Sequence, residues 1–131
     1  MGSDEVIPPD VRRFILTSID SVPHLEALLL LRYDVTAEWD AKAMSQRLYI
    51  SERRTAYLLE SLLAAGFAAV KRGSPDVYYY SPVTAELKDI LDRLAVIYSK
   101  KLVEVTNLIH SNLSKRAQQF GDAFKWQNEK D

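Results

Sequence analysis

The sequence predicts a mainly helical α+β fold with one small β-hairpin. Apolar residues recur at three- and four-residue spacing through most of the 131 residues, which is typical of amphipathic helices. The stretch Val77–Tyr80 is rich in strand-forming residues instead. Residues 73–76, Gly-Ser-Pro-Asp, are turn formers directly before it. We therefore expect helices on both sides of a single hairpin.

Two helices are expected near the N-terminus. Asp10 is expected to cap the first, over about residues 11–19, and Ser21 the second, over about residues 22–32. The apolar face of the first carries Val11, Phe14, Ile15 and Ile19. Because leucines lie on more than one side of the second helix, we expect it at the centre of the core.

A pair of helices separated by a tight turn is expected next. The first spans about residues 41–48 and the second about 52–65, with Ser51 as the N-cap of the second. Gly66 is expected to end this second helix in a left-handed conformation. Its buried face is expected to carry Thr55, Leu59 and Leu62.

The hairpin is expected to join strands at about residues 67–71 and 77–80, and Pro82 ends it. Alternation along the second strand places Tyr79 on the opposite face from Tyr78 and Tyr80. Trp39 is expected to be a structural plug between the helix pair and the hairpin.

From about Thr84 the apolar pattern predicts one long helix. Its stripe either packs onto its own domain or pairs with the same helix of a second subunit. We favour pairing in a homodimer, because about 25 helical residues span about 37 Å, more than a compact small domain. The predicted dimerisation residues are Leu87, Leu91, Leu94, Tyr98, Leu102, Val105 and Ile109.

Three regions are thus expected: a flexible N-terminus (1–10), a helix with a helix-turn-helix and hairpin (11–82), and a C-terminal helical region (83–131). A last helical stretch carries Leu113, Ala117, Phe120 and Phe124. Its aromatic end, with Trp126, is expected to cover the dimer seam or to bind a partner.

The composition gives little support for an enzyme. There is no cysteine, the 4 glycines form no phosphate-binding loop, and the 2 histidines, His24 and His110, lack metal-ligand spacing. We therefore expect no catalytic residues, no metal and no cofactor.

The N-terminal segment is acidic, contains two prolines and lacks the features of a secretory signal. No apolar run reaches the length of about 20 residues that a bilayer requires. A cytoplasmic protein without a membrane segment is the resulting expectation.

The net charge is −1, so any nucleic-acid contact must rest on a local basic patch. Two pairs of neighbouring bases are candidates: Arg53 with Arg54 at the start of the helix after Ser51, and Lys71 with Arg72 where the hairpin begins its turn.

The segment from Ala43 to Phe67 resembles the winged helix-turn-helix of the MarR-like and PadR-like bacterial regulators. The resemblance covers about residues 22–82 and includes the short leucine-ended helix, the turn with Ser51, and the Gly66-Phe67 step into the hairpin. It implies a DNA-binding transcriptional regulator. The helix over about 52–65 is then the recognition helix, and the hairpin over about 67–81 is the wing.

Helical spacing also turns the polar residues of the predicted recognition helix away from its buried face, toward a major groove that admits one helix. Arginine binds guanine or phosphate, and the bases of the hairpin can contact the adjacent backbone. The candidate residues for binding double-stranded DNA are Ser51, Arg53, Arg54, Tyr57, Ser61, Lys71 and Arg72. The residues identify no small-molecule effector.

The alternative function is that of a winged-helix module that binds another protein and not DNA. Three features favour it: the near-neutral charge, the aromatic C-terminal end, and Leu58, which is expected on the outward face of the recognition helix.

Overall fold

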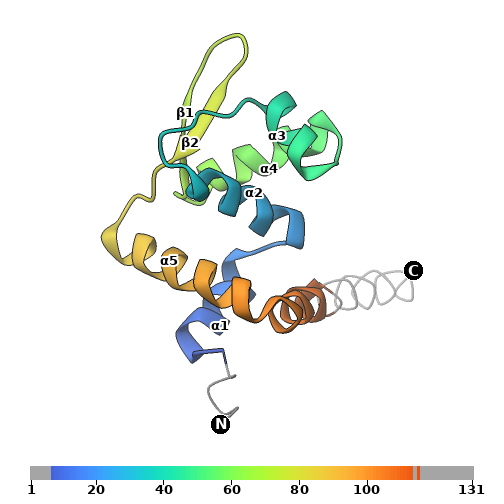
Figure 1. Ribbon diagram of the computed structural model, residues 1–131, viewed down its shortest axis with the longest axis vertical. Coiled ribbons are helices and arrows are strands. Elements are labelled where there is room, and N and C mark those ends of the chain that lie inside the picture. The colour runs from blue at the N-terminus through green and yellow to red at the C-terminus, as the bar shows by residue number, and fades with distance from the viewer. Residues whose placement is uncertain (1–6, 114, 116–131) are drawn as a thin grey trace, which may run out of the picture.

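The computed structural model describes residues 7–113 and 115. Within them the fold is mainly helical with one small antiparallel sheet, as predicted (Figure 1). The elements are α1 (Pro9–Ser18), α2 (Val22–Tyr33), α3 (Ala41–Leu48), α4 (Glu52–Ala64), β1 (Ala68–Lys71), β2 (Val77–Tyr80) and α5 (Ala85–Lys100). A further helix covers residues 102–113.

Side-chain caps explain where four of these helices begin. The side-chain oxygens of Ser21, Asp40, Ser51 and Thr84 each accept a hydrogen bond from the backbone N–H three residues later, at 2.7–3.2 Å. The predicted caps at Ser21 and Ser51 are therefore confirmed. The predicted cap at Asp10 is wrong, because α1 begins at Pro9, with Pro8 in the N-cap position, and Asp10 lies in its first turn.

The turn between α3 and α4 is tight. Tyr49 adopts a left-handed conformation (φ 58°) and its N–H donates to the carbonyl oxygen of Ser45 at 2.9 Å. This ends α3, and Ser51 starts α4 two residues later. The side chain of Tyr49 itself is almost fully exposed.

The sheet is a hairpin whose register pairs Ala68 with Tyr80 and Lys71 with Val77. Trp39 extends it by one residue, since its backbone N–H and C=O each hydrogen-bond the backbone of Tyr78 at 2.8 Å. Tyr78 and Tyr80 are buried and Tyr79 is only partly so, which confirms the predicted alternation. The loop before α3 is thereby tied to the hairpin.

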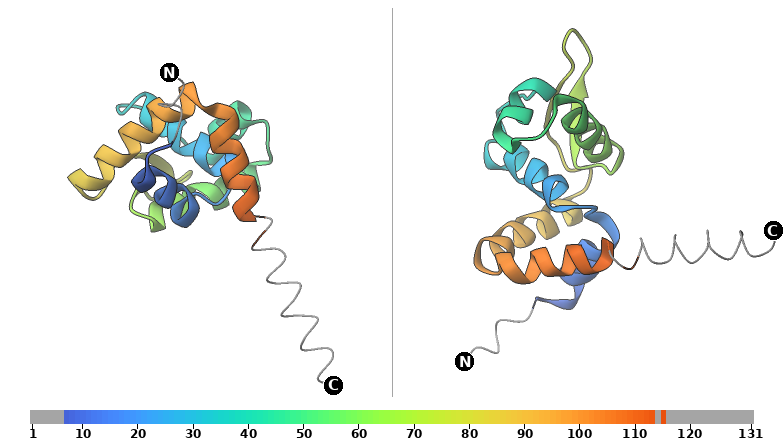
Figure 2. Two further views of the ribbon diagram at one scale, coloured as in Figure 1. Left: turned by 90° about the horizontal axis from the view of Figure 1, so that it is seen from below. Right: turned by 90° about the vertical axis from the view of Figure 1, so that its right-hand side faces the viewer.

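The central position of α2 is confirmed. Its side chains at Leu25, Leu28 and Leu31 are completely buried. α2 contacts α3, α4 and β2 in one layer, while α1, α5 and the helix over 102–113 lie beneath it (Figures 1 and 2). One continuous hydrophobic cluster joins the two layers.

The prediction of one continuous helix from Thr84 to Ile109 is wrong. α5 ends at Lys100, because Lys101 leaves the helical region (φ −126°, ψ 44°), and the next helix sets off in a new direction (Figure 2). The break has a packing reason. A straight helix of that length would carry its second half past the domain, whereas the bend returns Val105 and Ile109 to the core.

The predicted dimerisation stripe packs onto its own chain. Five of its seven residues are at most 8% exposed within a single chain, Leu87 is partly buried, and Leu102 is 52% exposed. The five are Leu91, Leu94, Tyr98, Val105 and Ile109. They are not free to form a seam with a second subunit in this arrangement, and pairing of two chains stays a prediction.

Across residues 7–113 and 115, no single helix is both long and apolar enough to span a membrane. α1 and α2 meet that test of length and composition only as a pair, and they are bent by 110° at the break between them. The residues Ala117, Phe120, Phe124 and Trp126, and residues 1–6 of the predicted flexible segment 1–10, lie outside the described residues. Within that segment, Pro9 and Asp10 belong to α1.

Candidate nucleic-acid interface

α4 is anchored along one face. Thr55, Leu59 and Leu62 are completely buried, as predicted. The hydroxyl of Thr55 donates to the carbonyl oxygen of Ser51 at 2.9 Å, which satisfies the one polar group on this face. The expectation that Leu58 points outward is wrong, because Leu58 is only 8% exposed. The buried face is therefore wider than predicted, which holds α4 more firmly.

The opposite face of α4 presents its first two turns to solvent. Arg53 and Arg54 are exposed, and Tyr57 is 75% exposed. Neither guanidinium has a hydrogen-bond or ion-pair partner among residues 7–113 and 115. Two unneutralised positive charges thus lie beside the helix N-terminus, where free backbone N–H groups also favour an anion.

Ser61 lies elsewhere. It is partly buried, and its hydroxyl is 3.3 Å from Nε2 of His24 on α2. Because Nδ1 of His24 accepts the backbone N–H of Asp20 at 3.2 Å, Nε2 carries the proton and donates it to Ser61. Ser61 thus joins α2 to α4, and its predicted outward orientation is wrong.

Burial lowers the pKa of the His24 imidazole below its usual 6.5, and the nearby Asp20 carboxylate opposes that shift. The ring is 2% exposed. A neutral ring fits the two hydrogen bonds described above, since only a neutral imidazole can accept at Nδ1.

Lys71, at the end of β1, is already paired. Its ammonium group donates to the carboxylate of Glu38 in the loop before α3 and lies 5.7 Å from the centre of the Tyr79 ring. The hydrogen bond to Glu38 raises the pKa of Lys71. The side chain remains solvent-exposed, so the pair is open to exchange with another anion.

Arg72 is held more completely. It donates to both carboxylate oxygens of Glu60 on α4 and to Asp76 across the hairpin turn at 2.9 Å. Tyr78 donates its hydroxyl to the same Glu60 carboxylate. These hydrogen bonds raise the pKa of Arg72, and burial together with Glu60 raises the pKa of Tyr78 to about 12.

The seven predicted residues therefore fall into three sets. Ser51, Arg53, Arg54 and Tyr57 lie on the exposed start of α4, and Ser61 faces α2. Lys71 and Arg72 lie on the hairpin with their charges balanced by acids. Sequence reasoning missed Glu38 and Glu60, the acids that balance them.

Helical spacing offered one signal for Glu60, since it lies one turn after Tyr57 on the same face. No spacing rule connects Glu38 to Lys71, because they meet only through the pairing of Trp39 with Tyr78.

Within the part of the chain that the structure describes, no group of three or more His, Asp or Glu side chains is arranged to hold a metal ion. Comparison with protein-family models, with curated proteins and with solved structures finds no match for the chain.

Proposed function

We propose that this chain is a DNA-binding transcriptional regulator. In this proposal, residues from α2 to β2 act as a winged helix-turn-helix unit. The recognition helix α4 enters the major groove and the hairpin lies along the backbone as a wing. The turn at Tyr49, the buried face of α4 and the adjacent hairpin are all features that such a unit requires.

One observation carries the proposal. Arg53 and Arg54 are exposed, adjacent and without an acidic partner among the described residues, on a helix whose other face is locked in the core. Rigid presentation reduces the entropy lost on binding. Tyr57 lies one turn further on the same exposed surface and adds a hydroxyl that can reach a phosphate or base edge.

The hairpin plays a secondary part in this proposal. Because Glu38, Glu60 and Asp76 engage Lys71 and Arg72, a phosphate must compete with these acids for the cations. The hairpin then contributes mainly its position beside α4.

Pairing of two chains belongs to the same proposal, since two recognition helices would meet two half-sites of an operator. The second chain would use apolar side chains that remain exposed on α5 and the helix over 102–113. These are Val96, Leu102 and Val103, at 52%, 52% and 63% exposure.

The experiment measures fluorescence anisotropy of labelled mixed-sequence duplex DNA over a range of salt concentrations. The native chain is expected to bind with a steep salt dependence, because cations displace counterions from phosphates. The double change Arg53→Ala and Arg54→Ala is expected to weaken binding and to lower the salt slope by about 2.

The matched control is Arg13→Ala, an exposed arginine on α1, which is expected to leave both affinity and slope unchanged. Equal binding by the native chain and the double variant would remove α4 from the interface.

One observation favours the second candidate, a module that binds a protein. The net charge is −1 and the two bases of the hairpin are balanced by acids, so the hairpin adds little free positive charge to that of α4. Absence of any duplex binding at low salt, together with capture of one specific protein that the Arg53 and Arg54 changes abolish, supports this candidate over the regulator.

A further inference from the structure

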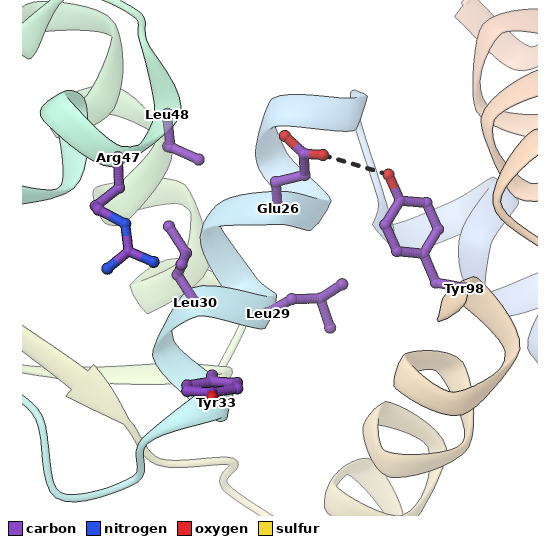
Figure 3. A pocket seen from close by; sticks show the side chains of 7 residues that line it. All are labelled: Glu26, Leu29, Leu30, Tyr33, Arg47, Leu48 and Tyr98. Carbon is purple, nitrogen blue, oxygen red and sulfur yellow. Dashed lines mark hydrogen bonds between the residues drawn. The ribbon is translucent and has the colours of Figure 1, made fainter. Parts of the chain in front are cut away.

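A groove of about 430 Å³ lies along one face of α2, between α3 and α5 (Figure 3). Its floor is apolar and consists of Leu29 and Leu30 of α2 with Leu48 of α3, all partly exposed. Sites for small ligands usually measure about 300–1,000 Å³ and are lined mainly by apolar side chains. The groove therefore has the size and the floor of a small-molecule site.

Two opposite charges line the same groove. Glu26 projects from α2 toward α5, where its carboxylate accepts the hydroxyl of Tyr98 at 3.4 Å (Figure 3). Arg47 projects from α3 beside Leu30, and its guanidinium carbon is 5.7 Å from the centre of the Trp39 ring. Neither forms an ion pair with any of residues 7–113 and 115, so both charges are available to a ligand.

The charge pattern restricts the class of ligand. A simple anion would be attracted by Arg47 but repelled by the carboxylate of Glu26. A simple cation would be attracted by Glu26 but repelled by Arg47. A polar zwitterion would cover the leucine floor without benefit from it. A molecule with an apolar body and one charge of each sign satisfies all three features.

We propose that this groove binds a small zwitterion with an apolar body. Its anionic group pairs with Arg47, its cationic group pairs with Glu26, and its body covers Leu29, Leu30 and Leu48. Tyr33, which is 89% exposed at the rim, adds an aromatic face beside the body. The inference does not rest on DNA binding, because no residue of α4 or of the hairpin lines the groove.

The test uses three probes that share one aromatic body: 4-(aminomethyl)benzoate, benzoate and benzylamine. Each is titrated into the ¹⁵N-labelled full chain, and amide shifts are followed by two-dimensional NMR. The zwitterion is expected to give saturable shifts at residues 26–33 and 47–48, and each singly charged probe is expected to bind about tenfold more weakly.

Variants assign each charge. Arg47→Gln is expected to bind 4-(aminomethyl)benzoate only as tightly as the native chain binds benzylamine. Glu26→Gln is expected to bind it only as tightly as the native chain binds benzoate. Arg13→Gln, an exposed arginine outside the groove, is expected to leave all three affinities unchanged. Both groove variants alter exposed side chains, so unchanged amide shifts far from the groove will show that they fold.

Three outcomes overturn the inference: equal affinity for the three probes, saturable shifts confined to another surface, or no saturable shift up to the solubility of the zwitterion.

Discussion

Arg72 and Glu60 join the hairpin to α4, because both terminal nitrogens of the guanidinium contact the two carboxylate oxygens. Nη1 of Arg72 is 2.6 Å from Oε2 of Glu60, and Nη2 is 3.3 Å from Oε1. The same carboxylate accepts the hydroxyl of Tyr78, and Arg72 also donates to Asp76. A two-pronged pair fixes orientation better than a single contact does, so the hairpin is held at one angle to α4.

We predict that Glu60→Gln raises the affinity for duplex DNA and increases the salt slope by up to about 1, because it removes one of the two acids that hold Arg72 and leaves only Asp76 to compete with a phosphate. It should also speed amide hydrogen exchange over residues 68–80, because the hairpin loses its ion pair with α4. Anisotropy against salt concentration and hydrogen exchange measure the two effects separately.

Glu86→Gln, at an exposed acid in the first turn of α5, is the matched control and should change neither quantity. An unchanged salt slope in Glu60→Gln would mean that Arg72 only positions the hairpin. Unchanged hydrogen exchange would mean that the pair with Glu60 does not hold it.

His24 should make folding stability depend on pH. Its pKa is lowered in the folded chain, mainly by burial, from 6.5. As the pH falls below about 6.5, the unfolded chain binds a proton that the folded chain excludes, so the free energy of unfolding decreases. As the pH falls, the free energy of unfolding begins to decrease near the pKa of His24 in the unfolded chain and stops decreasing below its pKa in the folded chain. The slope is at most about 1.4 kcal/mol per pH unit.

Urea unfolding between pH 7.5 and pH 5.5 measures this slope. His24→Gln should flatten it, whereas His110→Gln, at an exposed histidine on the helix over 102–113, should keep it. The same slope in native chain and His24→Gln would assign the titration to other groups.

Local signals in the sequence were enough to predict most elements. Ser21 and Ser51 are N-caps, and Gly66 follows the C-terminus of α4 in a left-handed conformation (φ 84°). The burial of residues 78–80 alternates as expected. Each of these depends on residues fewer than five apart, so spacing alone contains the information.

The failures concern contacts between distant segments. Leu58 is buried, and Ser61 is partly buried, against neighbouring elements that helical spacing within α4 cannot locate. The break at Lys101 follows from the packing of both halves of the stripe onto one core, and no glycine or proline marks it. The exposed residues at the start of α4 were therefore predicted, whereas the acids that pair with Lys71 and Arg72 are brought in by tertiary contacts.

Leu94 distinguishes a core residue from a dimer seam. It is completely buried within one chain, so Leu94→Ala should lower the free energy of unfolding by about 2–5 kcal/mol. Because the lost contacts lie inside the chain, the effect should not depend on protein concentration. Leu102→Ala, at 52% exposure in the same stripe, should cost less than about 1 kcal/mol. An effect of Leu94→Ala that shrinks on dilution would place this residue in an interface between subunits, because dilution dissociates the subunits.

Of the two glycines that the structure describes, Gly66 is the one where a methyl group should be less well tolerated. Its φ of 84° is unfavourable for other residues, and an added Cβ would lie 2.9 Å from Cγ2 of Val83. Val83 is exposed and its side chain can turn aside, so the backbone conformation supplies most of the cost. Gly66→Ala should therefore lower the free energy of unfolding by about 1–2 kcal/mol.

Gly73→Ala is the matched control, because the nearest atom to its added Cβ is the carbonyl oxygen of Pro75 at an ordinary 3.5 Å. Gly73→Ala is expected to change the free energy of unfolding by no more than about 0.5 kcal/mol. Thermal unfolding of both variants compares them directly. Equal losses would show that chain flexibility, which both substitutions reduce, matters more here than the left-handed conformation at the end of α4.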